Sequence, residues 1–186
     1  MRIIAGKYKN RVIPTLKNSG YRPSTAKFRE ALFSILSSGE FAKSQILLGA
    51  NILDVYSGSG AISFEAISRG AGSACLIDNN ADNLRIAREF AEKIGANDNM
   101  NFLQIDALFL PKSTRTFEIV FIDPPYYRNM AVKTIKSLIS NGWLANGAVA
   151  AIELAKNEHM DEIDGLELLK NNIYGNSRLL LFKYNF

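Results

Sequence analysis

The most informative chemistry of this chain lies in a short loop, Asp123-Pro124-Pro125-Tyr126, which directly follows the apolar run 119–122. A short apolar run predicts a buried β-strand, so the loop stands at a strand end. The two prolines lack a backbone N–H, which leaves acceptors without competing donors. Asp123 adds a carboxylate, and the ring of Tyr126 can stack on a base. These groups suit a planar ligand that carries an NH2 group; a proline-stiffened turn with a helix-capping Asp is the alternative.

A glycine-rich turn lies upstream, between a predicted strand over 51–56 and a helix-like pattern over 61–69. Gly58 and Gly60 in this turn allow close approach to the backbone, and the N-terminus of the following helix favours an anionic group. Strand, glycine turn and helix form the nucleotide-cofactor arrangement of a doubly wound sheet. A dinucleotide fingerprint would have Gly or Ala at position 63, where this chain has Ser63. The composite pattern D-x-x-x-G-x-G is more specific than the glycines alone.

Carboxylates recur at the ends of predicted strands. Four successive strands end near Asp54, Asp78, Asp106 and Asp123. Ligands of open α/β sheets bind at the carboxyl edge of the strands, so we expect these four side chains to meet there. Asp78 follows Asp54 by 24 residues, near the spacing of an acid that holds ribose hydroxyls. A single aspartate at a strand end is more often a turn former or helix cap, but four at one edge beside a glycine loop favour a ligand site.

The D-x-x-x-G-x-G and D-P-P-Y pair resembles the class I S-adenosylmethionine-dependent methyltransferases that modify exocyclic amino groups. Further blocks resemble the bacterial family that makes N2-methylguanine in 16S ribosomal RNA. They are M-R-I-I-A-G-K-Y at 1–8, R-P-S-T at 22–25, R-E-A-L-F at 29–33, N-G-W-L at 141–144 and Tyr174-Gly175. The resemblance extends from Arg2 to Tyr184. An Asp-Arg pair common in the N-terminal motif is Ala26-Lys27 here, and the strand-end acid, usually Glu, is Asp78.

The resemblance implies S-adenosyl-L-methionine as the cofactor, with the glycines near its methionine part. Asp78 would accept from the ribose hydroxyls, Asp106 from the adenine amino group, and Asn79 would cover the ring. Asp54 would be a partner of the methionine amine or lie behind it. The expected cofactor residues are Asp54, Tyr56, Gly58, Gly60, Asp78, Asn79, Asp106 and Ala107.

At the target end, the expected catalytic residues are Asp123, Pro124, Pro125 and Tyr126. Asp123 and the Pro124 carbonyl would bind the exocyclic NH2 and aim its lone pair at the methyl group. Tyr126 would stack on a base that has left its helix or loop.

Charge is concentrated at the N-terminus. The chain has a net charge of +4, yet residues 1–29 hold eight basic residues and no acidic one. Such a basic arm indicates a polyanionic partner. We expect a short hairpin with Gly6 and Asn10 in its turn region, with Tyr8 and Tyr21 able to stack on bases. The expected RNA contacts are Arg2, Lys7, Lys9, Arg11, Arg22 and Arg29. A solvated terminus with incidental charge is the alternative.

Composition restricts the possible classes of protein. One cysteine rules out a disulfide framework within the chain, and one cysteine with one histidine argues against a clustered metal site. No apolar run approaches the length that spans a bilayer. We therefore expect a cytoplasmic protein without a metal or a membrane partner, acting as a monomer.

Alternating strand and helix patterns predict an α/β protein with a mainly parallel sheet. Helices are expected over 25–37, 80–94 and 130–140, and later strands over 148–154, 166–174 and 179–184. A connector with a short helical piece is expected over 38–50. The resemblance implies a Rossmann-like class I methyltransferase fold, with a seven-stranded sheet, helices on both faces and only the last strand antiparallel. We expect one methyltransferase domain over 1–186, with a basic arm over 1–24, an N-terminal helix over 25–37 and a catalytic core over 51–186.

These patterns together predict an enzyme that methylates the exocyclic N2 of a guanine in 16S ribosomal RNA, within a small ribosomal subunit or an assembly intermediate. Two alternatives stay open. One is a DNA amino-methyltransferase acting on adenine N6 or cytosine N4, because the D-P-P-Y loop selects an NH2 group and not a whole base. The other is a non-catalytic ribosome-assembly factor with the same fold.

Overall fold

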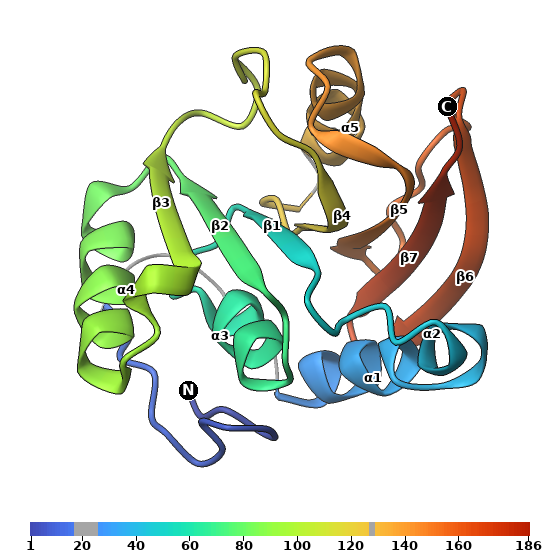
Figure 1. The fold of residues 1–186 in the computed structure, drawn as a ribbon. Helices are drawn as coiled ribbons and strands as arrows, with labels where there is room; N and C mark the ends of the chain where they lie inside the picture. The colour runs from blue at the N-terminus through green and yellow to red at the C-terminus, as the bar shows by residue number, and fades with distance from the viewer. Residues whose placement is uncertain (17–25, 127–128) are drawn as a thin grey trace.

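The computed structural model describes residues 1–16, 26–126 and 129–186. Its centre is a seven-stranded sheet with the strand order β3-β2-β1-β4-β5-β7-β6 (Figure 1). Neighbouring strands from β3 to β5 pair in parallel, and β7 is antiparallel to both β5 and β6. The strands are β1 (Asn51–Val55), β2 (Ser73–Asp78), β3 (Met100–Gln104), β4 (Phe117–Ile122), β5 (Leu144–Ala155), β6 (Leu166–Tyr174) and β7 (Ser177–Tyr184). The expected mainly parallel sheet with one antiparallel strand is confirmed.

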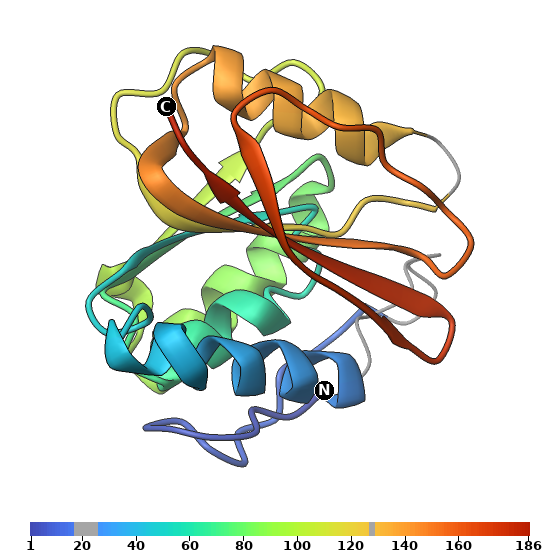
Figure 2. The same cartoon turned by 90° about the vertical axis from the view of Figure 1, so that its right-hand side faces the viewer.

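Helices cover both faces of this sheet. Figure 2 shows α5 on one face, and α1, α3 and α4 on the other. They are α1 (Ala26–Leu36), α2 (Gly39–Lys43), α3 (Ala61–Ser68), α4 (Ala81–Ile94) and α5 (Met130–Ser140), with a 3-10 turn at Asn97–Asn99. Since successive side chains of a strand point to opposite faces, both faces of β1 and β4 are apolar and buried. Ile52 and Ile119 thus pack with α3, while Leu53 and Val120 pack with α5.

The ends of the helices follow local rules. The side chain of Asn80 caps α4 by accepting from the N–H groups of Asp82 and Asn83. Gly95 ends the same helix in the left-handed conformation, with φ of 69°. The helices expected over 80–94 and 130–140 are observed as α4 and α5. The expected helix over 25–37 is observed as α1, and its proposed cap at Ser24-Thr25 lies outside the described residues.

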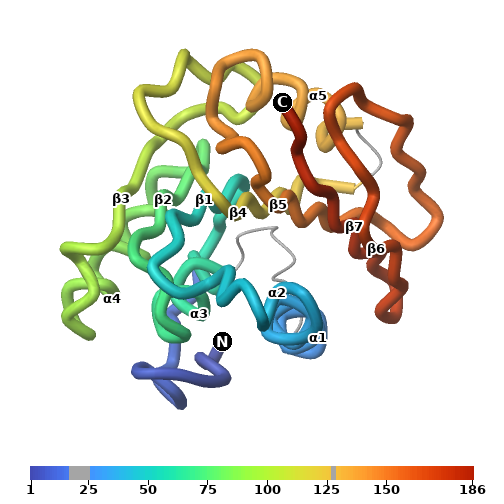
Figure 3. Tube along the Cα trace, turned by 45° about the vertical axis from the view of Figure 1, so that its right-hand side comes forward, coloured from blue at the N-terminus to red at the C-terminus, as the bar shows by residue number. Residues whose placement is uncertain are grey.

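The first thirteen residues fold back on themselves and form a hairpin-like arm. A single antiparallel bridge joins Arg2 to Val12, and the chain reverses between them. Ile3 and Ile13 are each 1% exposed and join the core formed with α1, α3 and α4. In Figure 3 this arm, in dark blue, lies under α3 at the bottom of the view. The arm is thus packed against the body of the protein.

Candidate active site

The structure brings the four predicted aspartates to one edge of the sheet. Asp54 is the penultimate residue of β1, Asp78 is the last residue of β2, and Asp123 directly follows β4. Asp106 lies two residues beyond the end of β3. Val55, the last residue of β1, pairs with residues 77 and 122 on its two neighbours, and its carbonyl accepts from the Asp123 N–H at 3.4 Å. Parallel pairing therefore places these four residues at one edge of the sheet.

The glycine turn after β1 is held from the neighbouring strand. Oδ2 of Asp78 accepts from the N–H of Gly58 at 2.7 Å, and Oδ1 accepts from the N–H of Asn80 at 2.8 Å. Gly60 has φ of 71°, and a Cβ there would lie 2.6 Å from the Leu76 side chain. Tyr56 also has a positive φ, 64°. The strand-end acid thus orders the loop, and the remaining lone pairs of its carboxylate can accept from a ligand.

Asp54 sits beneath this turn in contact with α3. Its Oδ2 accepts from the hydroxyl of Ser63 at 2.7 Å and from the Ser63 N–H at 3.2 Å. Burial raises the pKa of Asp54 to about 7; the two Ser63 hydrogen bonds oppose this shift, and the nearby Asp78 carboxylate adds to it. These contacts give a physical reason for serine at position 63, where a dinucleotide fingerprint has Gly or Ala.

Several features of the turn suit a nucleotide cofactor. Among the described residues, the buried hydroxyls of Ser57 and Ser59 have no hydrogen-bond partner, so they are available to a ligand. Asn79 is exposed beside Asp78, and Asp106 forms a tight turn in which Oδ1 accepts from the Leu108 N–H at 2.9 Å.

The other two predicted cofactor residues, Tyr56 and Ala107, contact neighbouring parts of the protein. Ala107 is 3% exposed. The hydroxyl of Tyr56 hydrogen-bonds to that of Thr134 on α5 at 2.7 Å, which fixes its ring beside the turn. The turn thus offers carboxylates, hydroxyls and backbone groups, which fit a polar organic cofactor.

A small open cleft joins the end of β1 to Asp123, the first residue of the D-P-P-Y loop. Asp54, Tyr56 and Ser57 line it from β1 and the glycine turn, and Asp123 lines it from the end of β4. Phe28 and Leu32 of α1, and Leu179 of β7, form apolar walls. In Figure 2 the N-terminal end of α1 and the segment after β4 both lie toward the right of the view. Of the predicted site residues, the cleft therefore brings together Asp54, Tyr56 and Asp123, whereas Asp78 and Asp106 lie outside its lining.

Tyr126 is anchored by two residues that the sequence did not single out. Its hydroxyl donates to Oε1 of Glu153 on β5 at 3.0 Å and lies 2.9 Å from the hydroxyl of Ser177 on β7. Ser177 also donates to Glu153, at 2.7 Å. Burial, with the nearby carboxylates of Glu153 and Asp123, raises the pKa of Tyr126 to about 12, against the opposing effect of the Ser177 hydrogen bond. An acid inside the apolar stretch 148–154 was the available signal for Glu153.

The arm keeps four of the six predicted RNA-contact residues on the surface: Arg2, Lys7, Lys9 and Arg11. The prediction that Arg29 contacts RNA is wrong, because Arg29 is 2% exposed. Its guanidinium donates to Sδ of Met1 at 3.0 Å and to the carbonyl of Arg2 at 3.2 Å. It holds the arm from inside the protein. Arg22 lies outside the described residues.

The predicted stacking role of Tyr8 is also wrong. Tyr8 is 8% exposed, and its hydroxyl donates to the Gly95 carbonyl at 3.2 Å, so its ring packs in the core. Tyr21 lies outside the described residues.

The family model described as "Conserved hypothetical protein 95" matches residues 1–183. The chain belongs to this family. An uncharacterized methylase of Rickettsia prowazekii is 37% identical, over 100% of this chain and 98% of that protein. The ribosomal RNA small subunit methyltransferase D of Escherichia coli K12 is 35% identical, over 82% of this chain and 74% of that protein. A solved structure of a putative methyltransferase from Escherichia coli has a TM-score of 0.85 and 30% identity, and covers 100% of this chain and 98% of that one.

The family match confirms the resemblance found in the motifs. Because the match to the conserved hypothetical protein 95 family begins at residue 1, it includes the arm as well as the sheet. The relatives named above are a methylase and methyltransferases. In the part of the chain that the structure describes, no helix is long and apolar enough to cross a membrane.

Proposed function

We propose that this protein is an S-adenosylmethionine-dependent methyltransferase that modifies the exocyclic N2 of a guanine in 16S ribosomal RNA. One observation carries the proposal: the Asp123 loop and the glycine turn leave adjacent strands and line one cleft. The residues proposed to hold the amino group and those proposed to hold the cofactor are thus neighbours. Proximity of this kind is a major source of rate enhancement in group transfer.

The residues of the glycine turn would hold the cofactor. Asp78, already oriented by Gly58 and Asn80, would accept from the ribose hydroxyls. The buried hydroxyls of Ser57 and Ser59 would find partners on the ligand. S-adenosylmethionine, when bound, supplies a methyl group on a positively charged sulfur. Asp54 would balance positive charge near the methionine end in its ionised form. Burial raises its pKa to about 7, so a cationic ligand would have to favour that form.

Asp123 and the Pro124 carbonyl would act on the target amine. The lone pair of an aryl amine is delocalised into its ring, so the amine is a poor nucleophile. Two acceptors that hold both N–H groups out of the ring plane would localise that lone pair and aim it. Preorganised acceptors also stabilise the positive charge that develops on the nitrogen. Asp123 would accept the proton that the methylated nitrogen releases.

The choice of RNA rests on the relatives and on the arm. The Escherichia coli relative is named as a small-subunit ribosomal RNA methyltransferase, and 82% of this chain aligns with it. Four exposed cations on the arm, Arg2, Lys7, Lys9 and Arg11, suit a phosphate backbone. The choice of guanine N2 rests on the resemblance of the N-terminal and C-terminal motifs. Such an enzyme would act in the cytoplasm on free or assembling small-subunit RNA.

Transfer of a labelled methyl group tests the proposal. The protein, labelled S-adenosylmethionine and one of three acceptors would be combined: free 16S RNA, small subunits from a strain that lacks the enzyme, or duplex DNA. We expect label in one of the two RNA acceptors and none in DNA. Label in DNA alone would favour the DNA amino-methyltransferase. Absence of both transfer and cofactor binding by calorimetry would favour a non-catalytic assembly factor.

A further inference from the structure

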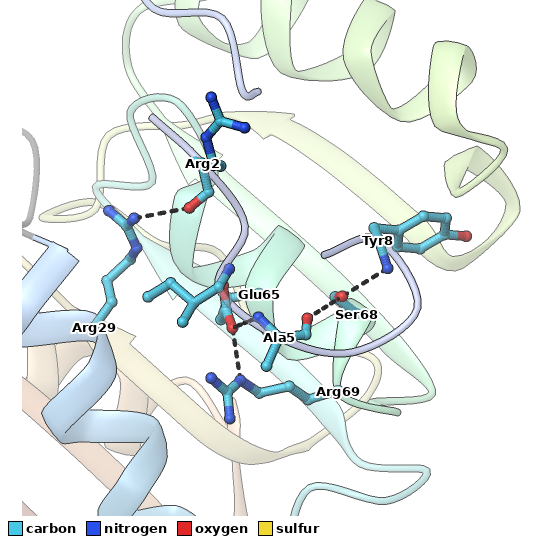
Figure 4. Close-up of polar contacts among 8 residues, drawn as sticks. Arg2, Ala5, Tyr8, Arg29, Glu65, Ser68 and Arg69 are labelled. Atoms are coloured by element: carbon cyan, nitrogen blue, oxygen red, sulfur yellow. Dashed lines mark hydrogen bonds and ion pairs between the residues drawn. The ribbon is translucent and has the colours of Figure 1, made fainter. Parts of the chain in front are cut away.

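The arm is held by its backbone, through two buried side chains of α3, Glu65 and Ser68 (Figure 4). Glu65 is 0% exposed and Ser68 is 4% exposed, although both are polar. Every residue of α3 is buried, because the sheet covers one side of the helix and the arm covers another. Glu65 and Ser68 face the arm, whereas Ser63 of the same helix contacts Asp54 in the cofactor site.

The carboxylate of Glu65 binds two consecutive N–H groups of the arm. Oε2 accepts from Ile4 at 2.7 Å, and Oε1 accepts from Ala5 at 3.0 Å. Oε1 also accepts from Nε of Arg69 at 2.7 Å, and the Arg69 guanidinium stacks over the Phe33 ring of α1. A buried charge is tolerated when it is paired and hydrogen-bonded, as Glu65 is. This acid therefore joins the arm, α3 and α1 at one point.

Ser68 fixes the next part of the arm. Its hydroxyl accepts from the Tyr8 N–H at 2.9 Å and donates to the Ala5 carbonyl at 2.5 Å. Its own carbonyl accepts from the Lys7 N–H at 2.7 Å. Between these contacts, Gly6 passes so close that a Cβ there would lie 1.7 Å from the Ser68 carbonyl oxygen, and its φ is 83°. Only glycine fits this approach.

The side chains of the arm separate into two groups. Ile3, Tyr8 and Ile13 are buried in the core, while Arg2, Lys7, Lys9 and Arg11 are exposed. The bonds from α3 go to backbone groups of the arm and leave its cationic side chains free of α3. Within the arm, Arg2 donates to the Asn10 carbonyl at 3.2 Å, and the Lys7 ammonium lies 5.1 Å from the centre of the Tyr8 ring. The arm is thus a platform with a fixed backbone and outward-facing positive charges.

We propose that Glu65 and Ser68 are positioning residues for RNA recognition, which hold the cations of the arm at a set place relative to the cleft. This inference rests on the proposed function. A free basic tail would bind phosphates as well, but it would lose conformational entropy on binding and would not orient the target base. An arm that is already fixed on α3 avoids that loss. The same helix contacts the cofactor site through Ser63. Glu65 and Ser68 touch neither RNA nor cofactor in this account; they act through the arm.

Gly6→Ala tests the inference, because it obstructs docking of the arm while keeping every charge of the arm and every residue of α3. Gly142→Ala is the matched control: Gly142 also has a positive φ, 70°, but a Cβ there would meet nothing within 4 Å. Both variants and wild type would be compared for cofactor affinity, for binding and methylation of small-subunit RNA, free and in subunits, and for amide hydrogen exchange at Ile4, Ala5, Lys7 and Tyr8.

In Gly6→Ala we expect faster exchange at these four amides and a KM for RNA raised about tenfold or more, the effect of losing preorganisation. Cofactor affinity, and kcat at saturating RNA, should stay near wild type. Gly142→Ala should match wild type in every readout. Faster exchange with an unchanged KM for RNA would overturn the inference, because the position of the arm would then not matter.

Two milder variants serve if Gly6→Ala does not fold. Ser68→Ala removes one hydroxyl, and Glu65→Gln removes the charge that Ile4, Ala5 and Arg69 share. Each should raise exchange of the arm and the KM for RNA together, with cofactor affinity retained. Loss of cofactor affinity in step with the melting temperature would instead assign these residues to stability alone and overturn the proposal. If wild type methylates no RNA, the proposed function fails, and the inference falls with it.

Discussion

The hydroxyl of Tyr126 donates a hydrogen bond to Oε1 of Glu153 at 3.0 Å, and this contact ties the loop after β4 to the neighbouring strand β5. The loop that is proposed to hold the target amine is therefore braced by the sheet. The brace fixes the orientation of the Tyr126 ring, which is the surface proposed to stack on the target base.

Tyr126→Phe should keep the ring and lose the brace. Because its pKa is raised to about 12, the hydroxyl stays protonated and donates throughout the physiological pH range. We expect kcat/KM for RNA to fall about tenfold, the loss of one hydrogen bond to a charged group, with unchanged cofactor affinity. Tyr174→Phe, which removes a hydroxyl from β6, is the control. Steady-state kinetics that match wild type in both variants would show that the brace does not matter.

Asp78→Ala should weaken S-adenosylmethionine binding by about 1–3 kcal/mol, the range for leaving a buried polar partner unsatisfied. The variant removes the proposed ribose acceptor and also releases the N–H groups of Gly58 and Asn80. Titration calorimetry measures the affinity. An affinity equal to that of wild type would remove Asp78 from the ribose role.

Asp54 should make cofactor binding depend on pH. Burial raises its pKa from 3.8 to about 7, so near neutral pH a large fraction of the carboxyl is protonated. A cationic ligand favours the charged form of Asp54, so the affinity for the cofactor should increase as the pH rises from about 6 to 8. Near pH 6, binding should release up to about one proton from Asp54. Calorimetry in buffers of different ionisation enthalpy counts that proton. Asp54→Asn should abolish the proton release on cofactor binding. A variant that releases as many protons as wild type would show that Asp54 is not the titrating group.

The Asp54 carboxyl should also make the stability of the fold depend on pH, but stability should fall as the pH rises. An unfolded chain releases the Asp54 proton near pH 3.8, whereas the folded chain retains it to about pH 7. The contribution of the raised pKa to stability is therefore complete below the unfolded value and is lost as the pH rises through 7. Denaturant unfolding should show Asp54→Asn gaining stability relative to wild type between about pH 4 and 7. A constant difference over that range would contradict the raised pKa.

Neutral replacement of Lys7, Lys9 and Arg11 should weaken RNA binding and flatten its salt dependence. Each lost phosphate contact should reduce the log–log salt slope by roughly one unit. Cofactor affinity should not change, because the arm lies outside the cleft lining. Equal slopes for the triple variant and wild type would show that these three charges do not contact phosphates.

Residues whose positions depend on strand order were predicted well from the sequence. The aspartates follow apolar strands, and parallel pairing brings such residues to one edge without knowledge of side-chain packing. The helix over 80–94 was similarly predictable, since the residues that begin and end a helix depend on local geometry. These features follow from short stretches of chain, where sequence patterns are informative.

Contacts between distant segments were not predictable in this way. Arg29 resembles any other cation of the basic arm in the sequence, and only the fold shows that it is buried against Met1. Tyr8 packs on Gly95, 87 residues away. Glu65 looks like an ordinary helix residue, but the arm covers it completely. Such roles depend on which surfaces meet, and no local pattern records that.

Asp123 is proposed to promote methylation of an amino group, and nucleoside analysis tests this role most directly. Small-subunit RNA treated with enzyme and labelled S-adenosylmethionine would be digested and separated, with Asp123→Ala in parallel. We predict label in N2-methylguanosine, and a loss on the order of 10²-fold or more in the variant despite normal cofactor binding. Label in N6-methyladenosine would keep the amino-group mechanism and contradict the substrate. Label on a ring carbon would contradict both.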